Sequence, residues 1–202
     1  MDLRHQLLSF HSRLGWAVAD LRRSLRLARY RINKGVCVFL FLCVCVIGAL
    51  GIGMRTMIDM KSEKQHHVKQ FHAQQLACLA RNVYYEARGE PLAGQYAVAE
   101  VTMNRKASRH YPKTVCEVVH QQNWDPLRKR MVGAFSWTEF NSLPEPSGDA
   151  WSRAKQIAEA VYFEKHIPTM DGALFFHATY VKPSWAKNKK RVAHIGRHVF
   201  YQ

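Results

Sequence analysis

An uninterrupted apolar run is the feature that most limits what this chain can fold into. Residues 35–54 read GVCVFLFLCVCVIGALGIGM and contain no charged side chain. A helix that rises about 1.5 Å per residue spans the ~30 Å hydrocarbon core of a bilayer with a run of this length. A buried core helix normally keeps a polar face, and a cleaved signal peptide normally has a shorter basic region and a shorter apolar core. The run therefore predicts an uncleaved transmembrane anchor.

Basic side chains gather on the N-terminal side of this run. Only Arg55 and Lys61 lie close on the other side. The positive-inside rule then places residues 1–34 in the cytoplasm as a basic arm and residues 55–202 outside. The N-terminal flank holds Arg22, Arg23, Arg26, Arg29, Arg31 and Lys34.

The net charge of +15 favours a polyanionic partner, but the position of the charge along the chain weakens the case for nucleic acid. Residues 1–34 hold eight basic and two acidic groups, so a large share of the excess lies outside any catalytic domain. A nucleic-acid-binding protein is one reading of this charge. An outward-facing domain without a nucleic-acid-binding motif argues against it. The expected partners are an acidic wall polymer and, through residues 35–54, the lipid bilayer.

The five cysteines divide between two compartments. Cys37, Cys43 and Cys45 fall in the apolar run, where they are expected to act as small apolar residues. Cys78 and Cys116 would face an oxidising space and could pair, although spacing alone does not establish a disulfide. The histidines lack the short paired spacing of a zinc site. We expect neither a metal nor a cofactor.

Residues 55–72 are polar and suit a juxtamembrane linker, as a helix or a stalk, and residues 73–202 are expected to form the outer domain. Apolar residues at helical spacing predict a helix that ends just after Glu86, since Gly89 and Pro91 follow. A second helix is expected over residues 92–106.

The rest of the domain gives mixed signals. Pro112 is expected to start a short helix through Val119, and residues 123–148 are expected to be loop. Asp149 is expected to cap an amphipathic helix. Aromatic and β-branched runs over residues 173–177 and 192–201 predict two short strands. The fold class is therefore α+β.

Two carboxylates stand at the end of the first expected helix. A partly buried Glu86 or Glu90 would have a raised pKa suited to general acid catalysis. The alternative is that both glutamates only pair with nearby arginines. Aromatic and amide side chains of the kind that line sugar-binding clefts accompany them. These are Gln95, Asn104, Ser136, Trp137, Phe176, His177 and Trp185.

Five segments in a fixed order resemble a known family. CLARNVYYEARGEPLAGQYAVAEVTMNR is followed by YPKTVCEVVHQ, FSW, ALFFHATYVKPSW and IGRHVFY. This order resembles the cell wall hydrolase family of the spore-cortex-lytic, SleB/CwlJ-like type, over roughly residues 76–201. The resemblance implies a lysozyme or lytic-transglycosylase-like domain that acts on the glycan strands of peptidoglycan. With the anchor, it implies a single-pass protein of the bacterial inner membrane whose domain faces the periplasm or wall.

The resemblance also assigns roles to residues. The family's catalytic glutamate falls on Glu86, with Glu90 as the secondary candidate, and Tyr84 of the same motif joins the expected substrate-binding set. Many relatives carry a cysteine soon after FSW, which this chain lacks. Cys78 and Cys116 are then the only pair available outside the apolar run.

One glutamate suffices if the substrate supplies its own nucleophile. The muramyl 6-hydroxyl can attack its own anomeric carbon after Glu86 protonates the leaving oxygen, which gives a 1,6-anhydro product. Lytic transglycosylase chemistry is therefore favoured over a hydrolytic muramidase or glucosaminidase, which would use two carboxylates. A non-catalytic wall-binding protein is the rival from another class. A bacterial remodelling enzyme and a phage lysis enzyme both fit the sequence.

Overall fold

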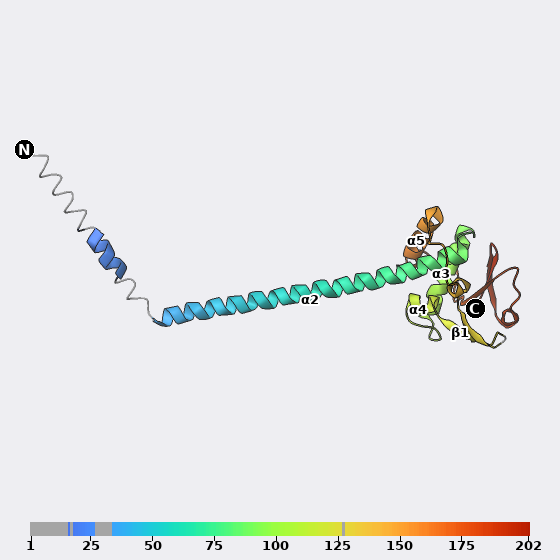
Figure 1. Cartoon of the computed structure of the whole chain (residues 1–202), viewed down its shortest axis with the longest axis horizontal. Coiled ribbons are helices and arrows are strands. Elements are labelled where there is room, and N and C mark those ends of the chain that lie inside the picture. The colour runs from blue at the N-terminus through green and yellow to red at the C-terminus, as the bar shows by residue number, and fades with distance from the viewer. Residues whose placement is uncertain (1–15, 17, 27–33, 127) are drawn as a thin grey trace, which may run out of the picture. The chain divides into compact units, whose positions relative to one another are not determined.

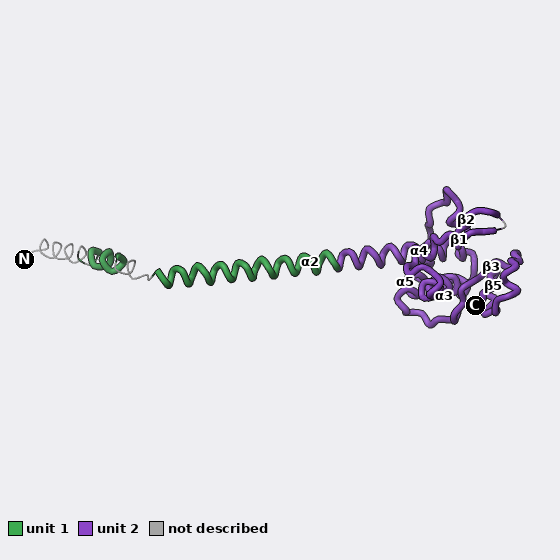
Figure 2. The backbone as a smooth tube through the Cα atoms, turned by 90° about the horizontal axis from the view of Figure 1, so that it is seen from below, with its two compact units in different colours: residues 1–64 green, residues 65–202 purple. Residues whose placement is uncertain are grey.

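The computed structural model describes residues 16, 18–26, 34–126 and 128–202. It divides the chain into two compact units, Met1–Lys64 and Gln65–Gln202 (Figure 2). Most of the expected basic arm, residues 1–34, lies outside the described residues. The second unit holds every strand described and all the side chains that form the site below.

A single helix, α2, covers Lys34–Ala87 (Figure 1). It contains the apolar run and residues 55–72, so the expected linker is helical throughout. Large apolar side chains of the run, such as Phe41 and Leu50, are exposed in the structure. The most apolar window has a mean hydropathy of 2.8 and is not buried, so α2 is long and apolar enough to cross a membrane by length and composition. The helix ends at Ala87, next to the end expected from Gly89 and Pro91.

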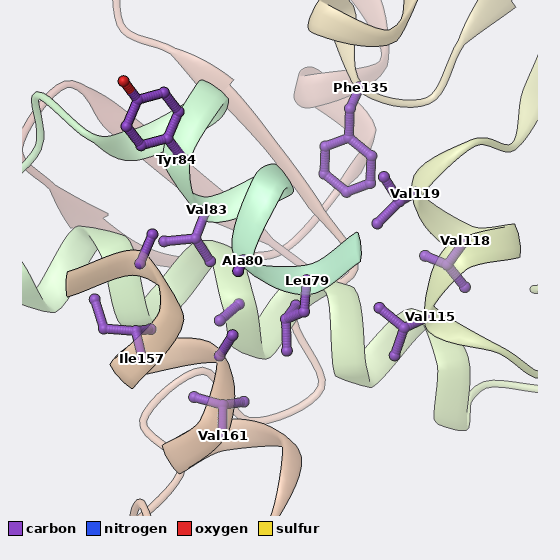
Figure 3. Packing of buried hydrophobic residues seen from close by; sticks show 13 residues of the cluster. Leu79, Ala80, Val83, Tyr84, Val115, Val118, Val119, Phe135, Ile157 and Val161 are labelled. Carbon is purple, nitrogen blue, oxygen red and sulfur yellow. The ribbon is translucent and has the colours of Figure 1, made fainter. Parts of the chain in front are cut away.

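Three further helices complete the helical part of the second unit. They are α3 (Leu92–Ala107), α4 (Val115–Val119) and α5 (Gly148–Tyr162). Leu79 and Val83 of α2 pack in one apolar cluster with Ile157 of α5 (Figure 3). Because these side chains recur every three or four residues, one stripe of each helix is buried. This cluster holds the C-terminal end of α2 in place.

Two helix starts differ from the expectation. The helix α4 begins at Val115, not at Pro112, because the Thr114 hydroxyl accepts a hydrogen bond from the backbone N–H of Glu117 and caps the helix. The expected cap of α5, Asp149, lies inside its first turn, where a negative charge favours the helix dipole. Ser147 occupies the cap position.

The loop expected over residues 123–148 contains a hairpin. Strands β1 (Gln122–Asp125) and β2 (Arg130–Gly133) pair antiparallel, and the short 3-10 helix η1 (Ser136–Glu139) follows. Both strands are mostly exposed, so they lack the alternating apolar pattern from which a strand is predicted.

The C-terminal region forms three strands, not two. They are β3 (Phe175–Ala178), β4 (Arg191–Ile195) and β5 (His198–Tyr201), in the order β3-β5-β4 with antiparallel pairing. The single strand expected over residues 192–201 is wrong because Gly196, with a φ of +58°, turns the chain between β4 and β5. The 3-10 helix η2 (Ser184–Asn188) lies between β3 and β4 in the chain.

A disulfide joins Cys78 of α2 to Cys116 of α4, with Cα atoms 5.2 Å apart. The amide side chain of Gln75 also accepts a hydrogen bond from the backbone N–H of Cys116. These contacts fix α4 against α2 two turns before Glu86. The second unit is therefore a mixed helix and strand domain built around the end of α2.

Candidate active site

The turn between α2 and α3 presents two carboxylates. The backbone N–H of Glu90 bonds to the carbonyl of Ala87, and Pro91 stands at the start of α3. Glu86 lies in the last turn of α2, and Glu90 lies in the turn itself. Although the two residues are only four positions apart, their surroundings differ.

Glu86 is half-buried beside η1. The Ser136 hydroxyl lies 3.5 Å from its Oε1. Burial raises the pKa of Glu86, while hydrogen bonds from the backbone of Trp137 and from Ser136, and the charge of Arg105, partly oppose the rise. No described cation lies within ion-pair distance of this carboxylate. Glu86 therefore has the surroundings of a general acid.

A chain of contacts holds η1 against Glu86. The Trp137 indole N–H donates to Oδ1 of Asn82 at 2.8 Å, and the Asn82 amide donates to Thr102 at 3.0 Å. The Trp137 ring also stacks on Tyr85, with centroids 4.8 Å apart. Asn82 is fully buried one turn before Glu86 on the same helix. The carboxylate and the loop that surrounds it are therefore fixed by the same helix.

Glu86 opens into a pocket of about 430 Å³, which we call the Glu86 pocket. Its walls come from α2, α3, the η1 segment and β3, together with residues near 180 and 198. Glu86 is the only carboxylate among the described residues that line it. Polar or aromatic side chains in the wall include Tyr85, Arg105, Ser136, Phe176, His177 and His198.

Positive and neutral groups in the wall are held by the fold. Arg105 is buried, its Nε donates to the carbonyl of Leu174 at 2.8 Å, and its guanidinium lies 4.8 Å from the Phe135 ring centroid. Burial lowers the pKa of His198, although Glu90 partly opposes the shift. The His177 Nε2 lies 3.0 Å from the hydroxyl of Tyr201. These contacts hold Arg105 and His177 in the wall of the pocket.

Glu90 has the opposite surroundings. It is buried and bonds to Arg197 twice, to the backbone N–H and to Nε of the side chain, each at 2.8 Å. Burial alone would raise the pKa of Glu90, but these two hydrogen bonds lower it below its ordinary value. A Cβ at Gly196 would collide with this carboxylate. The partner is thus Arg197, which is distant in the sequence, whereas the guanidinium of the nearby Arg88 lies over the Tyr84 ring.

The structure brings some of the expected substrate-binding residues to Glu86. Ser136, Phe176 and His177 line the Glu86 pocket. Trp137 lines a neighbouring hollow with Tyr85, and Trp185 lines a groove described below. These residues remain candidates for substrate contact.

Three expected substrate-binding residues are not at the pocket. Tyr84 is buried in the apolar cluster (Figure 3). Its ring contacts Trp151 edge to face. The buried amide of Gln95 donates to the carbonyl of Glu90. Asn104 donates to the carbonyls of Met170 and Ala173, which ties α3 to the segment before β3. Their polar atoms stabilise the fold and do not reach Glu86.

Sequence reasoning missed Tyr85 and Arg105. Tyr85 precedes Glu86 directly, and its hydroxyl donates to the carbonyl of Pro144. Arg105 ends the TMNR segment of α3, and a buried arginine in an otherwise apolar stripe is the signal that could have identified it. Among residues 16, 18–26, 34–126 and 128–202, no group of three or more His, Cys, Asp or Glu side chains could hold a metal ion.

Residues 89–201 match the Cell Wall Hydrolase family, and the chain belongs to this family. It is 28% identical to the spore cortex-lytic enzyme of Bacillus cereus over 122 residues, which is 60% of this chain and 42% of that protein. It is 29% identical to the spore cortex-lytic enzyme of Bacillus subtilis (strain 168) over 132 residues, 64% of this chain and 38% of that protein.

The aligned part spans about two fifths of the length of these relatives. A solved structure, the catalytic domain of the germination-specific lytic transglycosylase SleB from Bacillus anthracis, aligns with 63% of this chain and 93% of its own. The identity is 27% and the TM-score is 0.49.

Proposed function

We propose that this chain cleaves the glycan strands of peptidoglycan as a lytic transglycosylase with Glu86 as its one catalytic carboxylate. The observation that carries the proposal is that Glu86 alone among the described carboxylates lines its pocket, half-buried and without an ion pair. Membership of the cell wall hydrolase family and the spore cortex-lytic relatives support the substrate class. The mixed helix and strand architecture suits a lysozyme-like domain that presents a glutamate at a helix end.

The geometry suits one group that acts twice. Protonated Glu86, whose pKa is raised by burial, donates its proton to the oxygen of the scissile glycosidic bond, and that bond breaks. The 6-hydroxyl of the muramyl residue attacks the anomeric carbon and forms the 1,6-anhydro bond. The Glu86 carboxylate then takes the proton of that hydroxyl, which restores the starting state. Ser136 and the nearby backbone N–H groups steady the carboxylate between the two steps.

A hydrolase with two carboxylates would need a second acid about 5 to 9.5 Å away. Glu90 does not supply it, because two hydrogen bonds tie its carboxylate to Arg197 and it does not line the Glu86 pocket. This arrangement favours internal attack by the sugar over attack by water.

Mass spectrometry of the soluble products from purified peptidoglycan tests the proposal with the full-length protein in detergent. We expect muramyl ends that are 18 Da lighter than hydrolytic ends, because no water is added. Products with reducing muramic acid or glucosamine ends would show a muramidase or a glucosaminidase. Binding to the wall without any soluble product would favour a non-catalytic wall-binding protein.

We also propose that residues 35–54 anchor this enzyme in the bacterial inner membrane, with a domain over residues 73–202 outside. Support comes from the exposed apolar side chains of α2 and from the excess of basic residues before it. Protease added to spheroplasts should digest the C-terminal domain and spare the N-terminal arm. The reverse pattern would contradict this orientation, and release of the whole chain by high salt would contradict the anchor.

A further inference from the structure

The Glu86 pocket adjoins a larger hollow. A groove of about 760 Å³, which we call the Arg105 groove, shares Arg105, Ala134 and Phe176 with the wall of the Glu86 pocket. Its other walls include the β1–β2 hairpin, the segment before β3, and η2 with the residue after it. A substrate bound at the Glu86 pocket therefore lies next to the Arg105 groove.

The Arg105 groove is positively charged. Arg105 and Lys189 line it, His110 adds a third basic side chain, and no Asp or Glu occurs among the described residues of its wall. Lys189 has no ion-pair partner in the described part of the chain, and its Nζ lies 3.6 Å from the centroid of the Phe175 ring. A cation held over an aromatic face keeps its charge available for an anion.

Unpartnered polar atoms gather at the same place. Three buried side-chain atoms in the described ranges lack a hydrogen-bond partner: Nη1 of Arg105, Oε1 of Gln121 and Nδ1 of His198. All three residues line the Glu86 pocket or the Arg105 groove. A buried polar group without a partner costs roughly 1 to 3 kcal/mol, so the wall of this cleft holds polar groups that the fold itself leaves unsatisfied.

The chemistry of the groove combines donors for an anion with flat apolar surface. The Trp185 ring packs against the rings of Phe175 and Tyr201, and it lines the groove. The amides of Gln121 and Asn123 also line it. A chain of amide bonds that ends in carboxylates matches this set, since amide groups pair with amides and carboxylates pair with Arg and Lys.

We propose that the Arg105 groove binds the carboxylate-bearing stem peptide of the muramyl residue next to the bond that Glu86 cleaves. This inference rests on the proposed function and specifies the substrate of the same site. The lactyl carboxylate of a bare muramyl residue shares the anionic chemistry, but the groove is far larger than one carboxylate requires. A peptide-bearing glycan is therefore a better substrate than a bare one.

Two glycan substrates separate these sources of a carboxylate. The first is purified peptidoglycan with its stem peptides, and the second is the same material after an amidase has removed the stems and left the lactyl carboxylates. The full-length protein in detergent is assayed on both for kcat/KM from the rate at which new glycan ends form, counted by mass spectrometry. We expect at least a fivefold lower kcat/KM on the bare glycan. Equal values on both would overturn the proposal and leave the lactyl group as the anion bound.

Charge reversal in the groove gives the second comparison. Lys189→Glu should lower kcat/KM on the peptide-bearing glycan by about tenfold, the effect of losing one charged contact, and lower it clearly less on the bare glycan. Lys187→Glu is the matched control, because Lys187 is exposed on the neighbouring η2 and does not line the groove. It should change neither value more than twofold. Equal loss on both glycans in Lys189→Glu would overturn the peptide assignment.

Binding separates a failure of this inference from a failure of the proposed function. Pull-down of the full-length protein by the two glycans, each coupled to beads, reports on the groove without counting cleavage. Loss of cleavage on both substrates contradicts the proposed function alone. Stronger retention by the peptide-bearing glycan, reduced by Lys189→Glu and not by Lys187→Glu, supports the groove in that case too, and equal retention overturns it.

Discussion

Glu86 and Glu90 lie four residues apart at one helix end, yet the residues packed against them shift their pKa values in opposite directions. On the η1 face, Glu86 is desolvated, meets one hydroxyl and backbone N–H groups, and has a raised pKa. On the β4–β5 face, Glu90 meets Arg197 through two short hydrogen bonds and has a lowered pKa. The direction of each pKa shift depends on the segment packed against the carboxylate. Those segments lie 50 and 107 residues further along the chain.

The largest expected effect comes from removing the acid on the η1 face. Glu86→Gln keeps the shape of the side chain but has no proton to donate, so glycan cleavage should fall by about 10² to 10⁴-fold. More can be lost if the same group acts in both steps. Release of soluble product from purified peptidoglycan measures the loss.

Two controls accompany this variant. Thermal unfolding should show a folded domain, and the variant should still sediment with insoluble wall. Near-normal cleavage would remove Glu86 from the mechanism. Inactivity of a Glu90→Gln variant together with an active Glu86→Gln variant would transfer the role to Glu90.

The next effect concerns the support of the η1 face. Asn82→Ala removes the acceptor for the Trp137 indole N–H, so η1 loses its tie to α2. We expect kcat to fall about tenfold with little change in KM, since a small displacement of a catalytic group has large kinetic cost. Thr102→Val is the matched control, because Thr102 contacts Asn82 but not Trp137. An equal loss of kcat in Thr102→Val would show that Asn82 acts only on stability.

On the opposite face, the main effect should be on stability. Glu90→Gln removes the charge that pairs with Arg197, and we expect a loss of about 1 to 2 kcal/mol of unfolding free energy, limited by the exposure of the arginine. Cleavage should fall less than in Glu86→Gln, because Glu90 does not line the Glu86 pocket. Chemical denaturation at neutral pH measures the difference. A stable but inactive variant would show that Glu90 takes part in the chemistry.

The sequence predicted the parts of this site that depend on local pattern. The end of α2, the extent of α3 and the presence of Glu86 at a helix end all follow from periodicity and from Gly89 and Pro91. The general acid role assigned to Glu86 and the roles assigned to the site residues remain predictions.

Features that depend on tertiary contacts could not be predicted. The pairing of Glu90 with Arg197 needs the β4–β5 turn at Gly196, and no local pattern places that turn beside α2. Tyr84 and Asn104 carry groups that suit a sugar site, but their neighbours bury the first and bond the second to carbonyl groups. Residue type indicated the chemistry available, whereas packing decided which atoms reach the pocket.

The smallest expected effect, and the sharpest contrast, is the sign of the stability change with pH. A raised pKa means that Glu86 favours the folded state while protonated, and this contribution is lost as the pH rises through the folded-state pKa, above the ordinary 4.5. A lowered pKa means that Glu90 stabilises the folded state above its unfolded-state pKa. That contribution is lost as the pH falls through the folded-state value, below 4.5.

Glu86→Gln should therefore raise the unfolding temperature at neutral pH and leave it unchanged in acid, because the amide resembles the protonated acid. Glu90→Gln should lower it at neutral pH, with a difference that shrinks in acid. The cleavage rate of the wild-type protein should fall as the pH rises through the raised pKa of Glu86, since only the protonated form donates. Thermal scans of both variants and the wild type from acid to neutral pH measure the signs. Destabilisation by both substitutions at neutral pH would mean that Glu86 is held as a charged group, and the two faces of the turn would then treat their carboxylates alike.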